Sequence, residues 1–204
     1  MEIELLQAEE FTANCYILTD GDSVAVIDPG IYYQKAKEAL KKAKNKYILL
    51  THAHFDHILG LPKLKQETGA KVVISKTDSI GLKADNPLSL AKETGNNFVE
   101  TPADILVEDG SVIPFFDDEI KVIATPGHTE GSVCFSYKGN LFSGDTLFCN
   151  TIGRTDLPTG NMFKLLKSLK KLSELDENTV VYPGHDEWTT IKDEKAFNPY
   201  MKRI

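Results

Sequence analysis

The segment THAHFDHILG, residues 51–60, concentrates side chains that can bind metal or transfer protons. It holds three of the five histidines of the 204-residue chain, together with an aspartate, directly after the apolar run YILL. The other two histidines each follow a Pro-Gly pair, in ATPGHTEGS and VYPGHDEW, and a second aspartate ends an apolar run in LFSGDTLF. The candidate ligands are His52, His54, Asp56, His57, His128, Asp145 and His185.

All of these candidates lie at or just beyond the end of a predicted strand, and loops on a rigid scaffold are where chemistry is usually placed. Neutral imidazole and carboxylate suit zinc, iron or manganese, and no thiolate is needed. The alternative is that the histidines are ordinary surface or core residues. We disfavour it because four separate motif segments together hold all five histidines.

The number and spacing of the candidates predict two metal ions. In an extended or turning segment, His52 and His54 can point one way while Asp56 and His57 turn towards a second position. Six or seven ligands exceed the capacity of one tetrahedral ion. Two divalent ions a few ångströms apart are therefore expected, with zinc favoured and iron or manganese also suitable.

Composition narrows the class of protein. A net charge of −7 and a pI of about 5.3 argue against nucleic-acid binding, which needs a basic patch. No apolar run is long enough for a membrane span, and the N-terminus shows no signal peptide. Three cysteines without a CxxC pair argue against a disulfide framework, so we expect a cytoplasmic protein with neither a membrane nor a nucleic-acid partner.

Hydrophobic periodicity predicts strands alternating with helices in a single domain covering residues 1–204. Residues 14–20 and 23–30 are predicted to form a hairpin around a Gly-Asp turn. Further strands are expected at 46–51, 71–75, 111–116, 119–125, 132–137, 140–145 and 179–184, and helices at 33–44, 58–69, 162–175 and near the C-terminus. Two sheets packed together with helices outside would bury both sets of strands.

The region from Lys76 to Pro102 is the least periodic part of the chain. A long irregular stretch inside a compact domain is either functional or loosely ordered. It could be a flap over the site or a plain surface excursion.

The motif segments resemble those of metallo-β-lactamase-fold hydrolases, and among them the glyoxalase II-like (hydroxyacylglutathione hydrolase-like) group. The hallmark HxHxDH appears as HAHFDH, followed in family order by PGHTEGS, SGDTLF and YPGH, with VIDPG before them and GRTDLPTG after Asp145. The tail TTIKDEKAFNPYM also resembles small bacterial members. The resemblance implies an α/β (α+β) fold, a four-layer αββα sandwich with the metals at one edge of the two sheets.

The resemblance also implies roles for the candidate residues. One ion would be held by His52, His54 and His128, and the other by Asp56, His57 and His185, with Asp145 bridging. Asp28 in VIDPG resembles an aspartate that orients a ligand imidazole, and a simple turn-forming Asp-Pro-Gly is equally compatible with the sequence.

Two departures bear on the substrate. β-Lactamases of the common zinc type carry a cysteine where Asp145 stands, so an antibiotic substrate is disfavoured, and Cys149 is expected to be packed rather than ligating. Glutathione-thioester hydrolases carry a longer helical C-terminal region, whereas about twenty residues follow His185 here. A glutathione substrate is therefore less expected than a thioester or ester in general.

Three functions are compatible with a chain of this kind. The first is a dinuclear metallohydrolase cleaving a small-molecule thioester or ester by a metal-bridging hydroxide, with Asp56 orienting the water or accepting its proton. The second is a persulfide dioxygenase with one iron on the same fold, because GRTD is similar to a segment of those enzymes. A non-enzymatic or nuclease member is disfavoured by the intact ligand set and the acidic charge. We favour the hydrolase.

Four residues near the ligands could line a pocket, although packing or a salt link is the simpler role for each: Phe148, Arg154, Tyr182 and Trp188.

Overall fold

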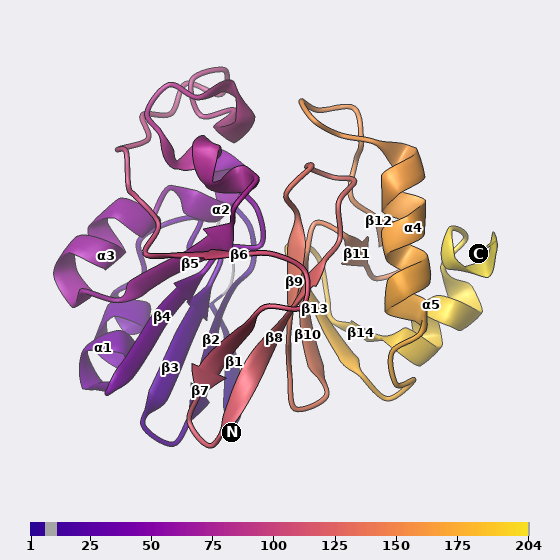
Figure 1. Cartoon of the computed structure of the whole chain (residues 1–204), viewed down its shortest axis with the longest axis horizontal. Coiled ribbons are helices and arrows are strands. Elements are labelled where there is room, and N and C mark those ends of the chain that lie inside the picture. Colours follow the sequence, from indigo (N-terminus) through magenta and orange to yellow (C-terminus); the bar gives the residue numbers. More distant parts are fainter. Residues whose placement is uncertain (7–11, 204) are drawn as a thin grey trace. The chain divides into compact units, whose positions relative to one another are not determined.

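The computed structural model describes residues 1–6 and 12–203. The chain forms two compact units, each containing a six-stranded sheet with helices against it (Figure 1). Unit 1 comprises Met1–Val107 and Pro114–Glu119, and unit 2 comprises Glu108–Ile113 and Ile120–Ile204. The single domain expected over residues 1–204 stays a prediction.

Unit 1 has a mixed sheet in the order β1-β2-β3-β4-β5-β6. The first three strands pair antiparallel, and β3 to β6 pair parallel. Every residue of β3 is buried, as expected of an interior strand covered on both faces. The strands are β1 Glu2–Leu6, β2 Cys15–Asp20, β3 Ser23–Ile27, β4 Asn45–Leu49, β5 Lys71–Ser75 and β6 Ile105–Val107.

The helices of unit 1 lie between parallel strands. They are α1 Gln34–Lys42, the short α2 Phe55–Ile58 and α3 Leu61–Thr68, and α1 contacts α3. Pro62 occupies the first turn of α3, where its missing N–H is tolerated, and Gly69 ends the helix with a left-handed φ of 65°. The predicted hairpin at 14–30 and the predicted helices at 33–44 and 58–69 are confirmed, and α2 was not predicted.

Unit 2 has a sheet in the order β14-β13-β10-β9-β8-β7, with a separate hairpin formed by β11 and β12. Its helices are α4 Met162–Ser173, α5 Ile191–Phe197 and the 3-10 helix η3 Met201–Arg203. The strands are β7 Val112–Phe115, β8 Asp118–Ala124, β9 Val133–Tyr137, β10 Asn140–Gly144, β11 Leu147–Phe148, β12 Thr151–Ile152, β13 Val180–Pro183 and β14 Thr189–Thr190. The longer strands match the predicted ones, and the two-residue strands were missed because they show no periodicity.

The segment from Lys76 to Pro102 contains only two short 3-10 helices, η1 Asp78–Leu82 and η2 Pro87–Ser89. The irregularity expected from the sequence is confirmed. Its proposed role as a flap stays a prediction. All three cysteines are free thiols, as expected. In the part of the chain that the structure covers, no helix combines the length and apolarity needed to span a membrane.

The apolar face of α4 packs in the core of unit 2 from Leu165 onward. Leu165, Leu169 and Leu172 are fully buried in the core of unit 2, whereas Met162 is 42% exposed. Met162 is the first residue of the helix, directly after the cap Asn161, and there the apolar face has not yet reached the core.

Replacing Leu169 by alanine should lower the free energy of unfolding by about 3 kcal/mol, because it removes a fully buried side chain and leaves a cavity. Met162→Ala on the same helix is the matched control and should cost less than about 1 kcal/mol. Urea denaturation followed by circular dichroism measures both. Equal losses for the two variants would contradict the burial pattern.

Candidate metal centre

The HAHFDH segment lies at the carboxyl end of the interior strand β4. Residues after Leu49 remain extended as far as His54, which precedes α2 with φ −70° and ψ 149°. Asp56 and His57 then fall within the single turn of α2. Alternation in the extended part places His52 and His54 on one side, and the helical turn brings His57 back beside them.

Three imidazoles gather within unit 1. His52 Nε2 lies 3.1 Å from His54 Nδ1, and the rings of His52 and His57 have centroids 4.1 Å apart. His57 Nε2 lies 3.7 Å from Asp56 Oδ2. All three histidines are buried, with exposed fractions of 3% or less. The segment therefore concentrates ring nitrogens and one carboxylate in a small volume.

Asp28 fixes the orientation of His57. Its Oδ2 lies 3.0 Å from His57 Nδ1 and accepts a hydrogen bond from the Thr51 hydroxyl, and its Oδ1 accepts from the Thr51 backbone N–H. The carboxylate can only accept, so Nδ1 of His57 carries the hydrogen and Nε2 is left to face Asp56. Asp28 also makes the turn, with φ 51° and its carbonyl accepting from Gly30. Asp28 therefore both forms the turn and orients an imidazole, and the metal-binding role of that imidazole stays a prediction.

Backbone contacts hold the aspartate of this segment in place. The carbonyl oxygen of Asp56 accepts a hydrogen bond from the Ala13 N–H, and a Cβ on Gly30 would lie 1.8 Å from that oxygen. Only a residue without a side chain allows this approach. The glycine of VIDPG is thus required by the position of HAHFDH.

Three further candidates gather within unit 2. Asp145 follows β10, and His128 and His185 follow β8 and β13. Asp145 Oδ2 lies 3.4 Å from His128 Nε2 and 3.7 Å from His185 Nε2. The carboxylate stands between two imidazoles, and only His185, at 35%, is substantially exposed.

The ring of His128 is oriented by the backbone. Its Nδ1 lies 2.8 Å from the carbonyl oxygen of Arg154, which can only accept, so Nδ1 carries the hydrogen. Gly153 makes this possible, because a Cβ there would lie 1.8 Å from the Asp145 carbonyl and 3.3 Å from His128 Nδ1. The Nε2 atom of His128 is therefore the one that faces Asp145.

The donor set in each unit fits a divalent metal. Histidine metal ligands usually donate their other ring N–H to a carboxylate or a backbone carbonyl, as His57 and His128 do here. Buried imidazoles and carboxylates with no thiolate among them suit zinc, iron or manganese. Residues able to hold metal are His52, His54, Asp56 and His57 in unit 1, and His128, Asp145 and His185 in unit 2.

The four predicted pocket residues have different surroundings. Phe148 lies edge-on to His185 with ring centroids 5.9 Å apart, and Tyr182 stacks on Phe142, with burial raising the pKa of its hydroxyl. Arg154 forms the expected salt link with Asp156 and lowers the pKa of that carboxyl to about 2. The prediction that Trp188 is packed is wrong, because its side chain is 63% exposed.

Cys149 is partly buried, as predicted. Its sulfur accepts a hydrogen bond from the Asn150 side chain, and burial, followed by the charge of Glu194, raises the pKa of the thiol.

Two residues near the candidate ligands, Thr51 and Glu194, were not predicted to form buried hydrogen bonds. The threonine directly before HAHFDH could have signalled a partner for Asp28, whereas a glutamate in an amphipathic helix gives no such signal.

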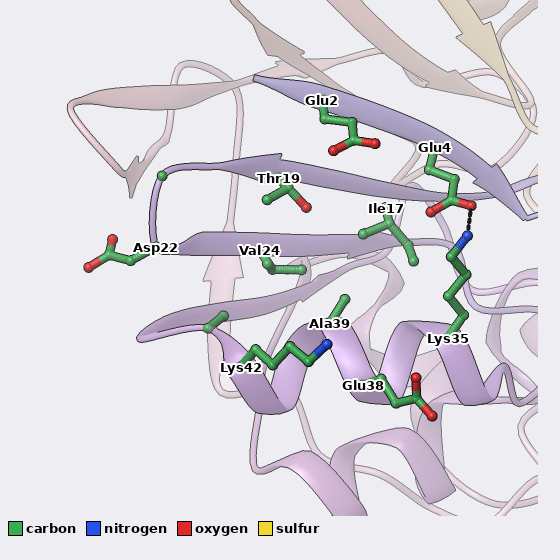
Figure 2. Close-up of a pocket in the computed structure, with 12 residues that line it drawn as sticks. Glu2, Glu4, Ile17, Thr19, Asp22, Val24, Lys35, Glu38, Ala39 and Lys42 are labelled. Carbon is green, nitrogen blue, oxygen red and sulfur yellow. Dashed lines mark hydrogen bonds and ion pairs between the residues drawn. The ribbon is translucent and has the colours of Figure 1, made fainter.

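A separate cavity of about 340 Å³ lies in unit 1 between the β1–β3 sheet and α1 (Figure 2). Its floor is apolar, with Ile17, Val24 and Ala39, and at its rim Lys35 pairs with Glu4. None of the seven candidate ligands lines it. Its polar groups do not converge on one point, so it is not the candidate centre (Figure 2).

Replacing Asp28 by asparagine should lower the free energy of unfolding by about 2 kcal/mol, because buried hydrogen bonds to a charged acceptor are lost. It should also shift His57 towards the Nε2–H tautomer, since an amide N–H facing Nδ1 favours a bare nitrogen there. Nitrogen-15 NMR of the imidazoles measures the tautomer. Asp22→Asn in the exposed β2–β3 turn is the control, and an unchanged His57 signal in Asp28→Asn would contradict the assignment.

Comparison with known proteins shows the family. The family model described as "Metallo-beta-lactamase superfamily" matches residues 8–185, a range that includes all seven candidate ligands. Hydroxyacylglutathione hydrolase GloC of Haemophilus influenzae is 31% identical over 209 residues, covering 98% of each chain.

Two solved structures are similar over nearly their whole length. The B3 metallo-β-lactamase BLEG-1 is 32% identical with a TM-score of 0.87, covering 98% of this chain and 99% of that one. TTHA1623 in a di-iron-bound form is 31% identical with a TM-score of 0.83, covering 97% of this chain and 99% of that one. The chain therefore belongs to the metallo-β-lactamase superfamily, as a metallo-hydrolase with that fold, in which the sheets are flanked by helices.

Proposed function

We propose that this protein is a dinuclear metal-dependent hydrolase of the glyoxalase II-like group that cleaves a small-molecule thioester or ester. His52, His54 and His128 would hold one divalent ion, and Asp56, His57 and His185 the other, with Asp145 shared between them. Membership of the superfamily and the fit of each unit's donor set support this assignment.

The observation that carries the proposal is the pairing of His128 with Asp145. Because Nδ1 donates to the Arg154 carbonyl, a neutral His128 ring directs the lone pair of Nε2 towards a carboxylate oxygen 3.4 Å away. Two electron-rich atoms at this distance repel each other unless a cation stands between them. A second proton on the ring or a metal ion could supply this positive charge, and membership of the metallo-β-lactamase superfamily favours the metal ion.

The metal would supply two things when bound: a hydroxide near neutral pH, since coordination can lower the pKa of water from 15.7 to about 7, and polarisation of the scissile carbonyl. Asp56 is the residue proposed to orient the attacking water and accept its proton. Its side chain is 17% exposed, so it stays accessible to water, and its backbone carbonyl is anchored by Ala13. The buried histidines would exclude further water.

A thioester is favoured as substrate by the similarity to GloC, whose name states a hydroxyacylglutathione substrate. The similarity to BLEG-1, described as a B3 metallo-β-lactamase, makes a β-lactam the natural competing substrate. Asp145 speaks only against the common zinc type of β-lactamase, which carries a cysteine at this position. The net charge of −7 agrees with a small-molecule substrate rather than a nucleic acid. We keep the cytoplasm as the proposed compartment.

A second candidate function is persulfide dioxygenase, which uses one iron. TTHA1623, which matches this chain in length and fold, is described in a di-iron-bound form, so iron suits a chain of this kind, although two ions agree with the stoichiometry of the hydrolase. Iron exchanges electrons with oxygen, which zinc cannot do. Metal identity and stoichiometry therefore separate the two candidates.

Metal analysis of the protein purified from its native host should give two divalent ions per chain, and a substrate panel should show thioester hydrolysis above β-lactam hydrolysis. The panel contains S-lactoylglutathione, a simple acyl thioester, an aryl ester and nitrocefin. Removal of metal with a chelator should abolish turnover, and added zinc should restore it. One iron per chain with oxygen uptake on glutathione persulfide would favour the dioxygenase instead.

Replacing Asp145 by alanine should reduce turnover at least about a thousandfold and lower the metal content to half or less, because a ligand shared by both ions is lost. The control is Asp109→Asn, an exposed aspartate of unit 2 paired with Lys171, which should keep both values. Inductively coupled plasma mass spectrometry and initial rates measure the effects. Full metal content in Asp145→Ala would disprove the bridging role.

A further inference from the structure

A buried carboxylate in unit 2 has no part in the proposed chemistry. Glu194, in the first turn of α5, has an exposed fraction of 0%. Within residues 12–203 no lysine or arginine forms an ion pair with it, in contrast to Glu177, which pairs with Lys195 at the surface. A buried charge without an opposite charge is costly unless hydrogen bonds satisfy it.

Glu194 is satisfied by three donors from three segments. The backbone N–H of Asn150 donates to both carboxylate oxygens at 3.0–3.1 Å. The Thr189 hydroxyl donates to Oε1 at 2.7 Å, and the Asn198 side chain donates to Oε2 at 2.7 Å. This set of contacts joins α5 to the β11–β12 hairpin and to β14.

The network fixes the turn of the β11–β12 hairpin. Glu194 holds the N–H of Asn150, a non-glycine residue with a left-handed φ of 60°. Asn198, also fully buried, donates to the carbonyl of Thr151 at 3.0 Å. A left-handed φ costs energy for an L-residue, so this turn needs support. Glu194 in α5 and Asn198 at the end of α5 hold the two sides of the turn.

This hairpin connects the network to two candidate ligands. It begins two residues after Asp145 and carries Phe148, whose ring meets the His185 ring edge-on at 83°. Thr189, whose hydroxyl donates to Glu194, lies four residues after His185. Glu194 thus contacts both segments that flank the partly exposed imidazole of His185, whose Nε2 lies 3.7 Å from Asp145 Oδ2.

We propose that Glu194 is a positioning residue of the metal centre, acting through the hairpin and Phe148 to confine the ring of His185. The inference rests on the proposed function, since it assigns His185 to a metal. Glu194 touches neither metal nor substrate. Its effect on the His185 ring passes through Phe148, whose ring contacts that imidazole edge-on.

Glu194→Gln tests the proposal, with Glu177→Gln as the matched surface control on the same unit. Substituting an amide for one acceptor oxygen should weaken zinc binding, measured by competition with a chromophoric chelator, at least about tenfold. The control should stay within about twofold of the original protein. Unchanged zinc affinity in Glu194→Gln, whatever its melting temperature, would show a purely structural role and overturn the proposal.

A second variant and a second measurement keep the test independent of folding and of metal. Phe148→Leu leaves the Glu194 contacts in place and should weaken zinc binding about five- to tenfold, so an unchanged affinity would again overturn the proposal.

In the metal-free full chain, the nuclear Overhauser contact between the Phe148 and His185 rings should disappear in Glu194→Gln and persist in Glu177→Gln. Its persistence in Glu194→Gln refutes the positioning role. Failure of the original protein to bind zinc refutes only the proposed function.

Discussion

A hydrogen on Nδ1 of a histidine decides what the other ring nitrogen can do, and this constraint governs both units. In His57 that hydrogen is held by the Asp28 carboxylate, and in His128 by the Arg154 carbonyl, two oxygens that cannot donate. Each ring is thereby left with Nε2 directed at another carboxylate, Asp56 or Asp145. Such an arrangement is unfavourable without positive charge, because the lone pair of Nε2 and the carboxylate oxygen repel each other. The folded protein therefore favours the binding of a cation at these positions.

The sheets supply this arrangement from their interior strands. β4 lies between β3 and β5, and β10 lies between β9 and β13, so the segments that leave their carboxyl ends are held by neighbours on both sides. Glycines then allow the backbone to come close: Gly30 against the Asp56 carbonyl and Gly153 against the Asp145 carbonyl. The two units use the same device, a side-chain-free residue beneath the carbonyl of a candidate ligand.

Much of the architecture could be predicted from local pattern. Apolar runs located the longer strands other than β1. Pro62 and Gly69 bounded α3 because each has a direct effect on the backbone. The ligand role of the seven candidates remains a prediction. Other features depend on contacts distant in sequence and could not be read locally. Asp28 reaches His57 only because β3 and β4 pair in register, and Glu194 depends on the Asn150 N–H of a hairpin 44 residues earlier in the chain.

The parallel order of β4, β5 and β6 has a consequence for how this protein can diversify. The irregular stretch from Lys76 to Pro102 is inserted after β5, whereas HAHFDH leaves β4 and returns through α3. The two excursions begin from different strands but pack together, since a Cβ on Gly81 would lie 2.5 Å from the Cβ of Ala53 within HAHFDH. Leu82, Leu88 and Phe98 of the insert also belong to the core of unit 1. Sequence change in this connection should therefore be tolerated at its exposed residues 92–95, whereas change at Gly81 would disturb the histidine segment.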